Sequence, residues 1–169
     1  TSFRDISKIK LPESAGRKYL QFPESFYEAG NFSYKGNFAG FITDFVAFGT
    51  LTSSMGTLTT DLAVIPDEQG RVTYRGKIAT DNFKLGELFK SDKIGTITFD
   101  GSVDGFFNKV NQSLAGAFEG DIEQLEINNY NYRNIKIDGI LNNKMFDGLV
   151  LMNDSNLEFD FLGTINLNP

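Results

Sequence analysis

Residues 157–167 read Leu-Glu-Phe-Asp-Phe-Leu-Gly-Thr-Ile-Asn-Leu, and every second position of this stretch is apolar or glycine. Only Leu162 places an apolar side chain among the intervening polar ones. Successive side chains of a β-strand point to opposite faces, so a period of two gives one apolar and one polar face. The stretch therefore predicts a half-buried β-strand.

The same alternation recurs along most of the chain. It predicts nine strands, at residues 31–38, 41–49, 56–65, 71–79, 95–106, 114–127, 131–141, 145–152 and 157–167. Polar stretches at residues 66–70, 141–144 and 153–156 separate neighbouring strands, and their Asn, Asp and Gly residues favour tight hairpin turns. Because such connections are too short for helical crossovers, we expect an all-β fold in which consecutive strands pair as an antiparallel meander.

Outside these strands the chain gives weaker signals. Residues 23–30 begin with Pro and end with Gly, as short helices often do, and residues 83–89 allow one helical turn. We expect residues 1–20 to form an N-terminal arm or a strand fragment. We expect residues 21–169 to form a single antiparallel β domain. Because the first residue is Thr1, we expect a piece excised from a longer chain.

Phenylalanine and glycine are unusually frequent, with 17 of each among 169 residues. Phe favours pleated, half-buried surfaces, and Gly within apolar runs marks bends, bulges or close backbone approach. The stripes of Phe, Ile and Leu on one sheet face fit two architectures. They form either the core of a closed sandwich or barrel, or an open apolar trough that holds acyl chains, and periodicity does not separate the two.

The composition excludes most catalytic chemistry. Histidine and cysteine are absent, so the chain can hold no Ser-His-Asp triad, Cys-His pair, zinc finger or disulfide framework. Acidic residues such as Asp100, Asp104, Glu119, Asp121 and Glu123 occupy the polar faces of predicted strands, as solvated side chains do. We expect no enzyme activity, no catalytic residue, no cofactor and no metal site.

The net charge narrows the range of partners. Sixteen Lys and Arg against 22 Asp and Glu give a formal charge of -6, which disfavours binding to phosphate backbones. No apolar stretch reaches the ~20 residues that a membrane-spanning helix needs. We therefore expect no nucleic acid partner and no membrane span in this chain.

One succession of residues is similar to a known family. Residues 130–139 read Tyr-Asn-Tyr-Arg-Asn-Ile-Lys-Ile-Asp-Gly, Phe-Asp-Gly follows at 146–148, and the alternating stretch 157–165 closes the series. Upstream, Tyr-Lys-Gly-Asn-Phe at 34–38 and Phe-Lys-Leu-Gly at 83–86 fit the same pattern. The order of these short motifs, over roughly residues 20–167, resembles the TamB family, the translocation and assembly module proteins related to AsmA.

The resemblance implies a fragment of a very long envelope protein, anchored in the inner membrane of a Gram-negative-type bacterium and crossing the periplasm. Members of the family are built from long bent β-sheets that fold over a hydrophobic groove, a β-taco-like architecture. They are linked to phospholipid transport toward the outer membrane and to the assembly of outer-membrane proteins. By this resemblance we expect the meander to curl into an open trough, and the family brings no catalytic motif to transfer.

These expectations give three hypotheses for the function. The first is a non-catalytic conduit that binds phospholipid acyl chains for transport between the inner and outer membrane. The second is an assembly module whose edge strands template β-strands of outer-membrane proteins, with the barrel assembly machinery or its substrate strands as partners. The third is a closed β-sandwich that serves as a spacer or adhesion module. For the first hypothesis, the expected groove residues are Ile135, Ile137, Leu157, Phe159, Phe161 and Ile165.

Overall fold

The computed structural model describes residues 1–10, 19, 27, 30–41, 44–66, 70–89, 91–108, 110 and 113–166. These residues include the helices α1 (Phe3–Ile6) and α3 (Leu85–Phe89). The strands are β1 (Phe32–Phe41), β2 (Asp44–Ser53), β3 (Gly56–Pro66), β4 (Arg71–Lys84), β5 (Ile94–Asn108), β6 (Ser113–Ile127), β7 (Tyr130–Asn142), β8 (Met145–Asn153) and β9 (Glu158–Asn166).

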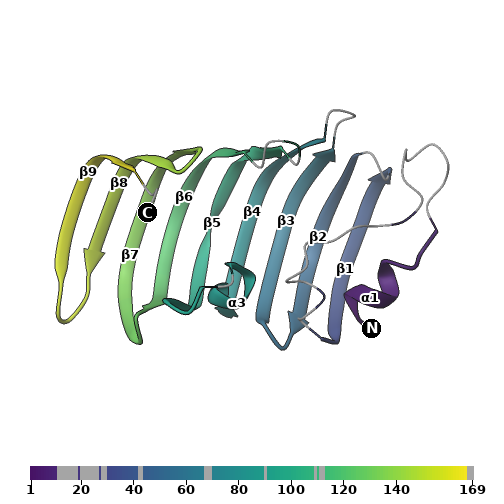
Figure 1. The fold of residues 1–169 in the computed structure, drawn as a ribbon, viewed down its shortest axis with the longest axis horizontal. Helices are drawn as coiled ribbons and strands as arrows, with labels where there is room; N and C mark the ends of the chain where they lie inside the picture. The colour runs from purple at the N-terminus through teal and green to yellow at the C-terminus, as the bar shows by residue number, and fades with distance from the viewer. Residues whose placement is uncertain are drawn as a thin grey trace.

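All nine strands belong to one sheet, and their order in the sheet is their order in the sequence. Each neighbouring pair is antiparallel (Figure 1). Within the described residues, β1 and β9 each have one strand neighbour, so the sheet does not close on itself. The predicted all-β antiparallel meander is confirmed, and each of the nine predicted strands is present with boundaries shifted by a few residues.

Tight turns join several of these strands. Asn128 and Asn129 link β6 to β7, and Asn143 and Lys144 link β7 to β8. All four residues have positive φ, between 46° and 69°, as two-residue hairpin turns of the type I′ class require. The backbone twist of such turns matches the right-handed twist of the strands, which explains why consecutive strands pair directly.

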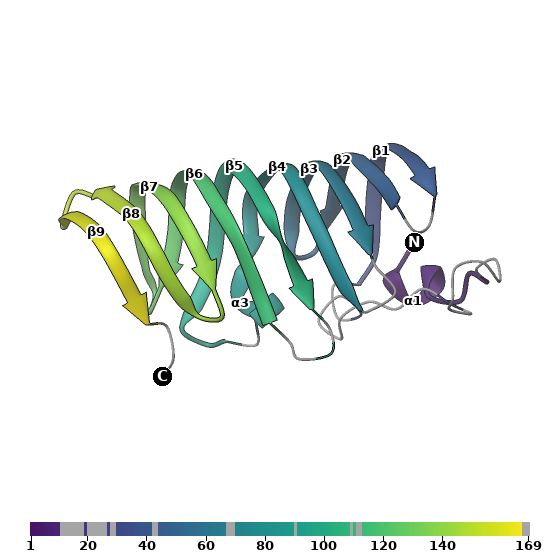
Figure 2. The same cartoon turned by 90° about the horizontal axis from the view of Figure 1, so that it is seen from above.

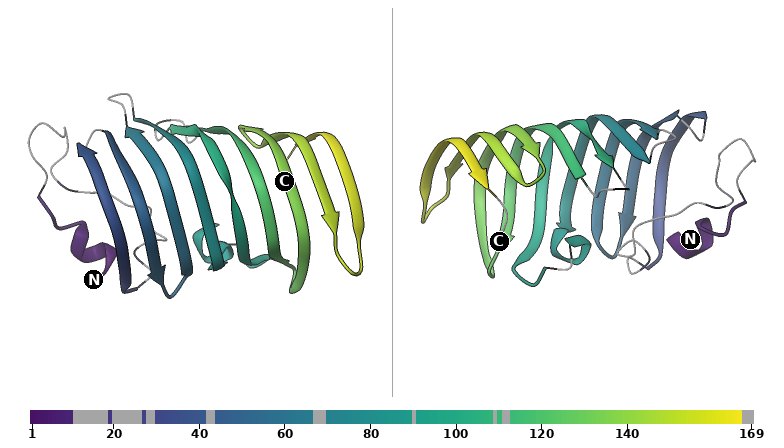
Figure 3. Two further views of the ribbon diagram at one scale, coloured as in Figure 1. Left: turned by 180° about the vertical axis from the view of Figure 1, so that it is seen from behind. Right: turned by 45° about the horizontal axis from the view of Figure 1, so that its top comes forward.

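The sheet is strongly curved. Seen from above and from a raised angle, the strands arch over, so that the sheet has a convex outer side and a concave inner side (Figures 2 and 3). Helix α3 lies on the inner side, in front of β4 and β5 (Figure 1). Within the described residues no second sheet covers that side. The described residues therefore form an open, curled sheet, as the resemblance implied, and not the closed sandwich of the third hypothesis.

The strand register assigns each residue to one side of the sheet, because residues directly opposite each other in antiparallel strands share a face. One line of paired residues on the inner side contains Tyr34, Leu51, Leu58, Thr80, Phe99, Ile122, Ile135, Met152 and Phe159. The next contains Gly36, Gly49, Thr60, Ile78, Gly101, Gly120, Ile137, Val150 and Phe161. Both lines cross the whole sheet.

Glycines on these and adjacent inner positions allow the sheet to bend. A Cβ atom added to Gly101 would lie 2.3 Å from the carbonyl oxygen of Glu119 on β6, and one added to Gly148 would lie 2.3 Å from that of Asp138 on β7. Side chains on the inside of a bend converge, so only glycine fits where neighbouring backbones approach this closely. The sequence expectation that glycines mark bends or close backbone approach is confirmed here.

A small core closes one corner of the sheet. Phe32 of β1, Met55 in the turn between β2 and β3, and Phe83 of β4 are buried there together with Phe3 of α1. The rings of Phe3 and Phe32 pack with centroids 4.3 Å apart. The N-terminal residues, predicted as an arm or a strand fragment, thus contribute a helical turn that packs on the sheet.

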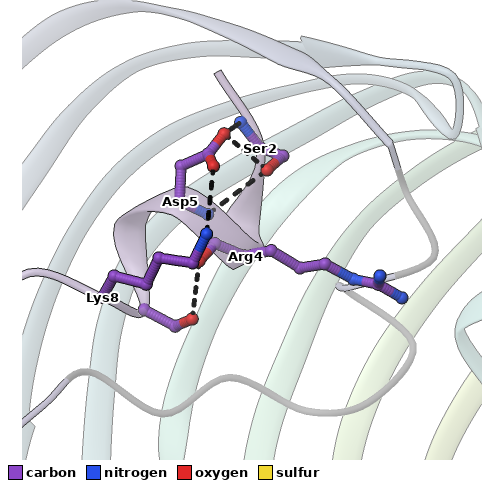
Figure 4. A network of polar contacts seen from close by, with 5 residues as sticks. Ser2, Arg4, Asp5 and Lys8 are labelled. Atoms are coloured by element: carbon purple, nitrogen blue, oxygen red, sulfur yellow. Dashed lines mark hydrogen bonds and ion pairs between the residues drawn. The ribbon is translucent and has the colours of Figure 1, made fainter.

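Helix α1 begins at a capping box (Figure 4). The backbone N–H of Asp5 donates to the Ser2 hydroxyl at 3.3 Å, and the backbone N–H of Ser2 donates to the Asp5 carboxylate at 3.0 Å. Helix α3 lies within residues 83–89, where one helical turn is predicted. The helix predicted over residues 23–30 lies largely outside the described residues.

Candidate functional site: the apolar inner face

The inner face of the sheet is apolar along its full width. The two lines of paired residues given above contain no charged side chain, and threonine and tyrosine are their only polar members. A line on the outer face contains Lys35, Thr50, Thr59, Ala79, Asp100, Asp121, Lys136, Leu151 and Asp160. The two sides of the sheet thus differ sharply in chemistry.

Most of the inner face remains partly accessible. Val103, Ile122, Ile135 and Phe146 are buried in it, with exposed fractions of 4–9%, while their neighbours on the same face are mostly half-buried. The chain exposes 11151 Å² of surface, about a third more than the roughly 8,300 Å² typical of a compact protein of this mass. The apolar surface that the described residues leave partly uncovered is the main candidate site.

The sequence-predicted groove residues share this face. Ile135 and Phe159 lie in one line, joined through Met152, and Ile137 and Phe161 lie in the next, joined through Val150. The structure therefore brings β7 and β9 residues together across β8, as the alternation predicts.

The two remaining predicted groove residues lie toward the margins. Ile165 is paired with the buried Phe146 and is 36% exposed. Leu157 lies in the turn before β9, where its backbone N–H and carbonyl both bond to Asp154, and it is 42% exposed. The predicted strand 157–167 therefore begins one residue later, and Leu157 belongs to the turn.

The inner face of β9 presents two aromatic rings. Phe159 and Phe161 stack with their centroids 6.2 Å apart and their planes 6° from parallel. Phe159 is 41% exposed, although its line continues inward to the buried Ile135. Exposure on this face therefore rises from the middle of the sheet toward β9.

A hydrogen-bonded turn fixes the position of β9. The Tyr130 hydroxyl donates to Asp154 Oδ1 at 2.5 Å, and the backbone N–H groups of Arg133 and Asn156 donate to the same carboxylate at 3.1 and 3.0 Å. The Asn156 side chain also donates to the Tyr130 hydroxyl at 2.7 Å. The bond from Tyr130, with those from Asn156 and Arg133, holds the pKa of Asp154 below its usual value. The turn between β8 and β9 is thus tied to the start of β7.

The carboxylates of the outer face are solvated and partly paired. Arg75 contacts Asp104 at 2.8 Å, and Lys136 contacts Asp121 at 3.2 Å, with all four side chains about half exposed or more. Among the residues that the structure describes, no cluster of acidic, His or Cys side chains is arranged to hold a metal ion. None of the described helices has the length and apolarity to cross a membrane.

Several inner-face residues were not singled out from the sequence as site residues. Tyr74 on β4, Phe99 on β5 and Phe118 on β6 all occupy positions on this face, and burial raises the pKa of the Tyr74 hydroxyl. The same alternation that predicted the strands of β7 and β9 would have identified them. Their place beside the predicted residues depends on the register, which alternation alone does not give.

Comparisons with protein-family models, with curated proteins and with solved structures return no match to this chain. The resemblance to the TamB family therefore stays a prediction that depends on the short motifs quoted above.

Proposed function

We propose that the inner face binds acyl chains, and that the chain is a non-catalytic module for phospholipid transport between the inner and outer membrane. The supporting observation is a sheet-wide face that carries no charged residue along its two lines of paired positions. Among the described elements, only α1 at one corner and α3 in front of β4 and β5 lie over this face. Acyl chains are long, flexible and apolar, and they need a continuous apolar surface with no specific polar contact.

The energetics favour such a ligand. Burying a methylene group contributes about 0.8 kcal/mol, so partial coverage of a long acyl chain gives substantial affinity. The absence of charge along Ile135, Ile137, Phe159 and Phe161 leaves an anionic or zwitterionic headgroup without a partner on this face. The headgroup would then remain in water at the open side, because burying an unpaired charge is costly.

The cellular setting is part of the same proposal. By the resemblance to the TamB family, the chain is a piece of an envelope protein that is anchored in the inner membrane and crosses the periplasm. The curled sheet with one apolar side is the architecture that this resemblance implies.

Photo-crosslinking tests which side of the sheet contacts lipid. Val150 and Leu149 are neighbours on β8, but the register places Val150 on the inner face and Leu149 on the outer face. A benzoylphenylalanine at either position would be irradiated in the presence of phosphatidylethanolamine vesicles. We expect a lipid adduct from position 150 and at most a trace from position 149.

Other outcomes would contradict the proposal. Equal adducts at both positions would indicate non-specific adsorption, and no adduct at either would favour a spacer role. A second irradiation would include unfolded outer-membrane protein together with the vesicles. Adducts of position 150 to that protein, with none to lipid, would favour the assembly hypothesis.

A further inference from the structure

Aromatic residues and glycines follow a fixed spacing on this sheet. On strands β1, β4, β5, β6, β8 and β9 an aromatic residue stands two positions before a glycine, so both side chains belong to one face. One pair from each of these strands is Tyr34 with Gly36, Tyr74 with Gly76, Phe99 with Gly101, Phe118 with Gly120, Phe146 with Gly148 and Phe161 with Gly163. The register places all of these pairs on the inner face. The pattern therefore belongs to the face that we propose as the acyl-chain site.

The Phe99 ring lies down on the sheet. A Cβ atom added to Gly101 would lie 2.5 Å from Cζ of Phe99, and one added to Gly120 on the next strand would lie 2.7 Å from Cε2 of the same ring. Since Cβ is the first side-chain atom above the backbone, the far end of the ring is at the height of the floor. Side chains of strands ordinarily stand roughly perpendicular to the sheet. The Phe99 ring instead occupies space that only glycines leave free.

Two further rings are placed in the same way. The Tyr74 hydroxyl oxygen would lie 3.0 Å from a Cβ atom on Gly105 of β5 and 3.3 Å from one on Gly116 of β6, so this side chain extends across two neighbouring strands. The Phe146 ring would lie 2.6 Å from a Cβ atom on Gly139 of β7. In both cases a glycine on another strand provides the space for the ring.

The position of these rings decides how much room the concave side retains. Upright rings on the inside of a curved sheet converge and fill the space in front of it, whereas rings laid over glycines leave that space free (Figure 2). We propose that the glycines under the rings are positioning residues of the acyl-chain site, because they lower the rings to the floor and so set the clearance for a hydrocarbon chain. The half-buried rings of Phe99 and Phe161 then form part of the floor that the chain contacts. This inference rests on the proposed function, since it concerns the same face.

Alanine substitutions at two of these glycines test the inference. Gly139→Ala places a methyl group against the Phe146 ring and 2.8 Å from the Asp147 carbonyl oxygen. Gly116→Ala is a milder second variant, because its nearest contacts are 2.9 Å or longer and include the Tyr74 hydroxyl. The matched control is Gly95→Ala. The three atoms nearest to its added Cβ all belong to the Glu126 side chain, and none belongs to a ring.

Binding of cis-parinaric acid, a fluorescent fatty acid, would be titrated for each variant below its urea unfolding transition. We expect the dissociation constant to rise about tenfold in Gly139→Ala and in Gly116→Ala, and by less than about twofold in Gly95→Ala. Adding Phe146→Leu to Gly139→Ala should restore binding, because the shorter side chain no longer projects into the trough. A purely structural role of the glycines predicts lower unfolding midpoints with unchanged binding, and no rescue.

The outcomes separate this inference from the proposed function. If the wild-type chain binds parinaric acid and the folded Gly116→Ala and Gly139→Ala variants bind it equally well, the inference is wrong and the proposed function stands. A folded double variant that does not regain binding would also overturn the inference. If Gly139→Ala does not fold, Gly116→Ala against Gly95→Ala decides the question. A wild-type chain that binds no parinaric acid would overturn the proposed function and this inference with it.

Discussion

Single residues on the inner face differ widely in how much change they should tolerate. Ile135 and Phe159 lie in the same line of paired positions, with Met152 between them. Ile135 is 4% exposed and Phe159 is 41% exposed. An unpaired carboxylate in a buried apolar site costs several kcal/mol, which is a large part of the free energy of unfolding of a typical domain.

We therefore expect opposite results from two glutamate substitutions. Ile135→Glu should abolish cooperative folding, whereas Phe159→Glu should lower the unfolding midpoint only slightly, since its carboxylate can reach water. Urea unfolding followed by circular dichroism measures both. Phe159→Leu is the matched apolar control. Equal loss of structure in the two glutamate variants would mean that the inner face is closed over at β9 as well as at β7.

The glycines of the bend give a second prediction. A Cβ atom on Gly101 would lie 2.3 Å from the Glu119 carbonyl oxygen, so Gly101→Ala forces the two strands apart. We expect a loss of about 1–3 kcal/mol in the free energy of unfolding. Ser102→Ala, the next residue on the opposite face, should change it by less than about 0.5 kcal/mol. Similar stabilities of the two variants would argue against a tight approach of β5 and β6.

Asp154 gives the fold a dependence on pH. Hydrogen bonds from Tyr130, Asn156 and Arg133 lower its pKa relative to the unfolded chain. The stabilisation is therefore present above the unfolded pKa and is lost as pH falls through the lower, folded pKa. Asp154→Asn should destabilise the chain at pH 7 and reduce the difference in stability between pH 7 and pH 3. An unchanged pH profile in thermal unfolding would show that this carboxylate is not linked to folding.

Among the elements, α1 depends entirely on its packing. Four residues are far too few for an isolated helix to be stable, so its turn is held by the capping box and by Phe3 in the corner core. If the corner core folds together with the rest of the sheet, Phe3→Ala should lower the free energy of unfolding by about 3–5 kcal/mol. Hydrogen exchange should show faster exchange at the start of β1 and little change in β8. If hydrogen exchange became faster by the same factor in all strands, the sheet would unfold as one cooperative unit, and the corner would not open separately.

The elements also show which features of this fold could be read from the sequence. Period-two alternation predicted all nine strands, because each strand has one apolar and one wet face. It underestimated the length of β4, since Asn82 has a positive φ of 46° and the strand continues through this irregularity to Lys84. It missed α1, whose Ser2–Asp5 capping box was the only local signal.

The candidate site was predictable only in part. Alternation placed Ile135, Ile137, Phe159 and Phe161 on apolar faces, and the register confirmed that they share one side. Curvature was not readable from alternation, because it arises where glycines on neighbouring strands meet, and that requires the register. The choice between an open trough and a closed core therefore depended on the structure.

For the whole molecule, the large accessible surface has a thermodynamic consequence. The sensitivity of stability to denaturant scales with the surface exposed on unfolding. With 11151 Å² already exposed in the folded state, unfolding exposes about 15% less surface than for a compact chain of the same mass. We expect a urea m-value lower by about that fraction, provided that unfolding is two-state. Bound acyl chains should raise the midpoint, since a ligand that binds only the folded state stabilises it.

The strand order also bears on how the chain is made. Each strand from β2 to β9 pairs with the one synthesised just before it, so none of these strands has to wait for a distant partner strand to leave the ribosome. Local hairpins keep loop-closure entropy small and folding fast for a β protein. The sheet can therefore grow strand by strand at the pace of translation, with the most recent strand as its only new exposed edge. Partly made chains would carry an exposed edge at their most recent strand, and they would need protection from one another on crowded polysomes.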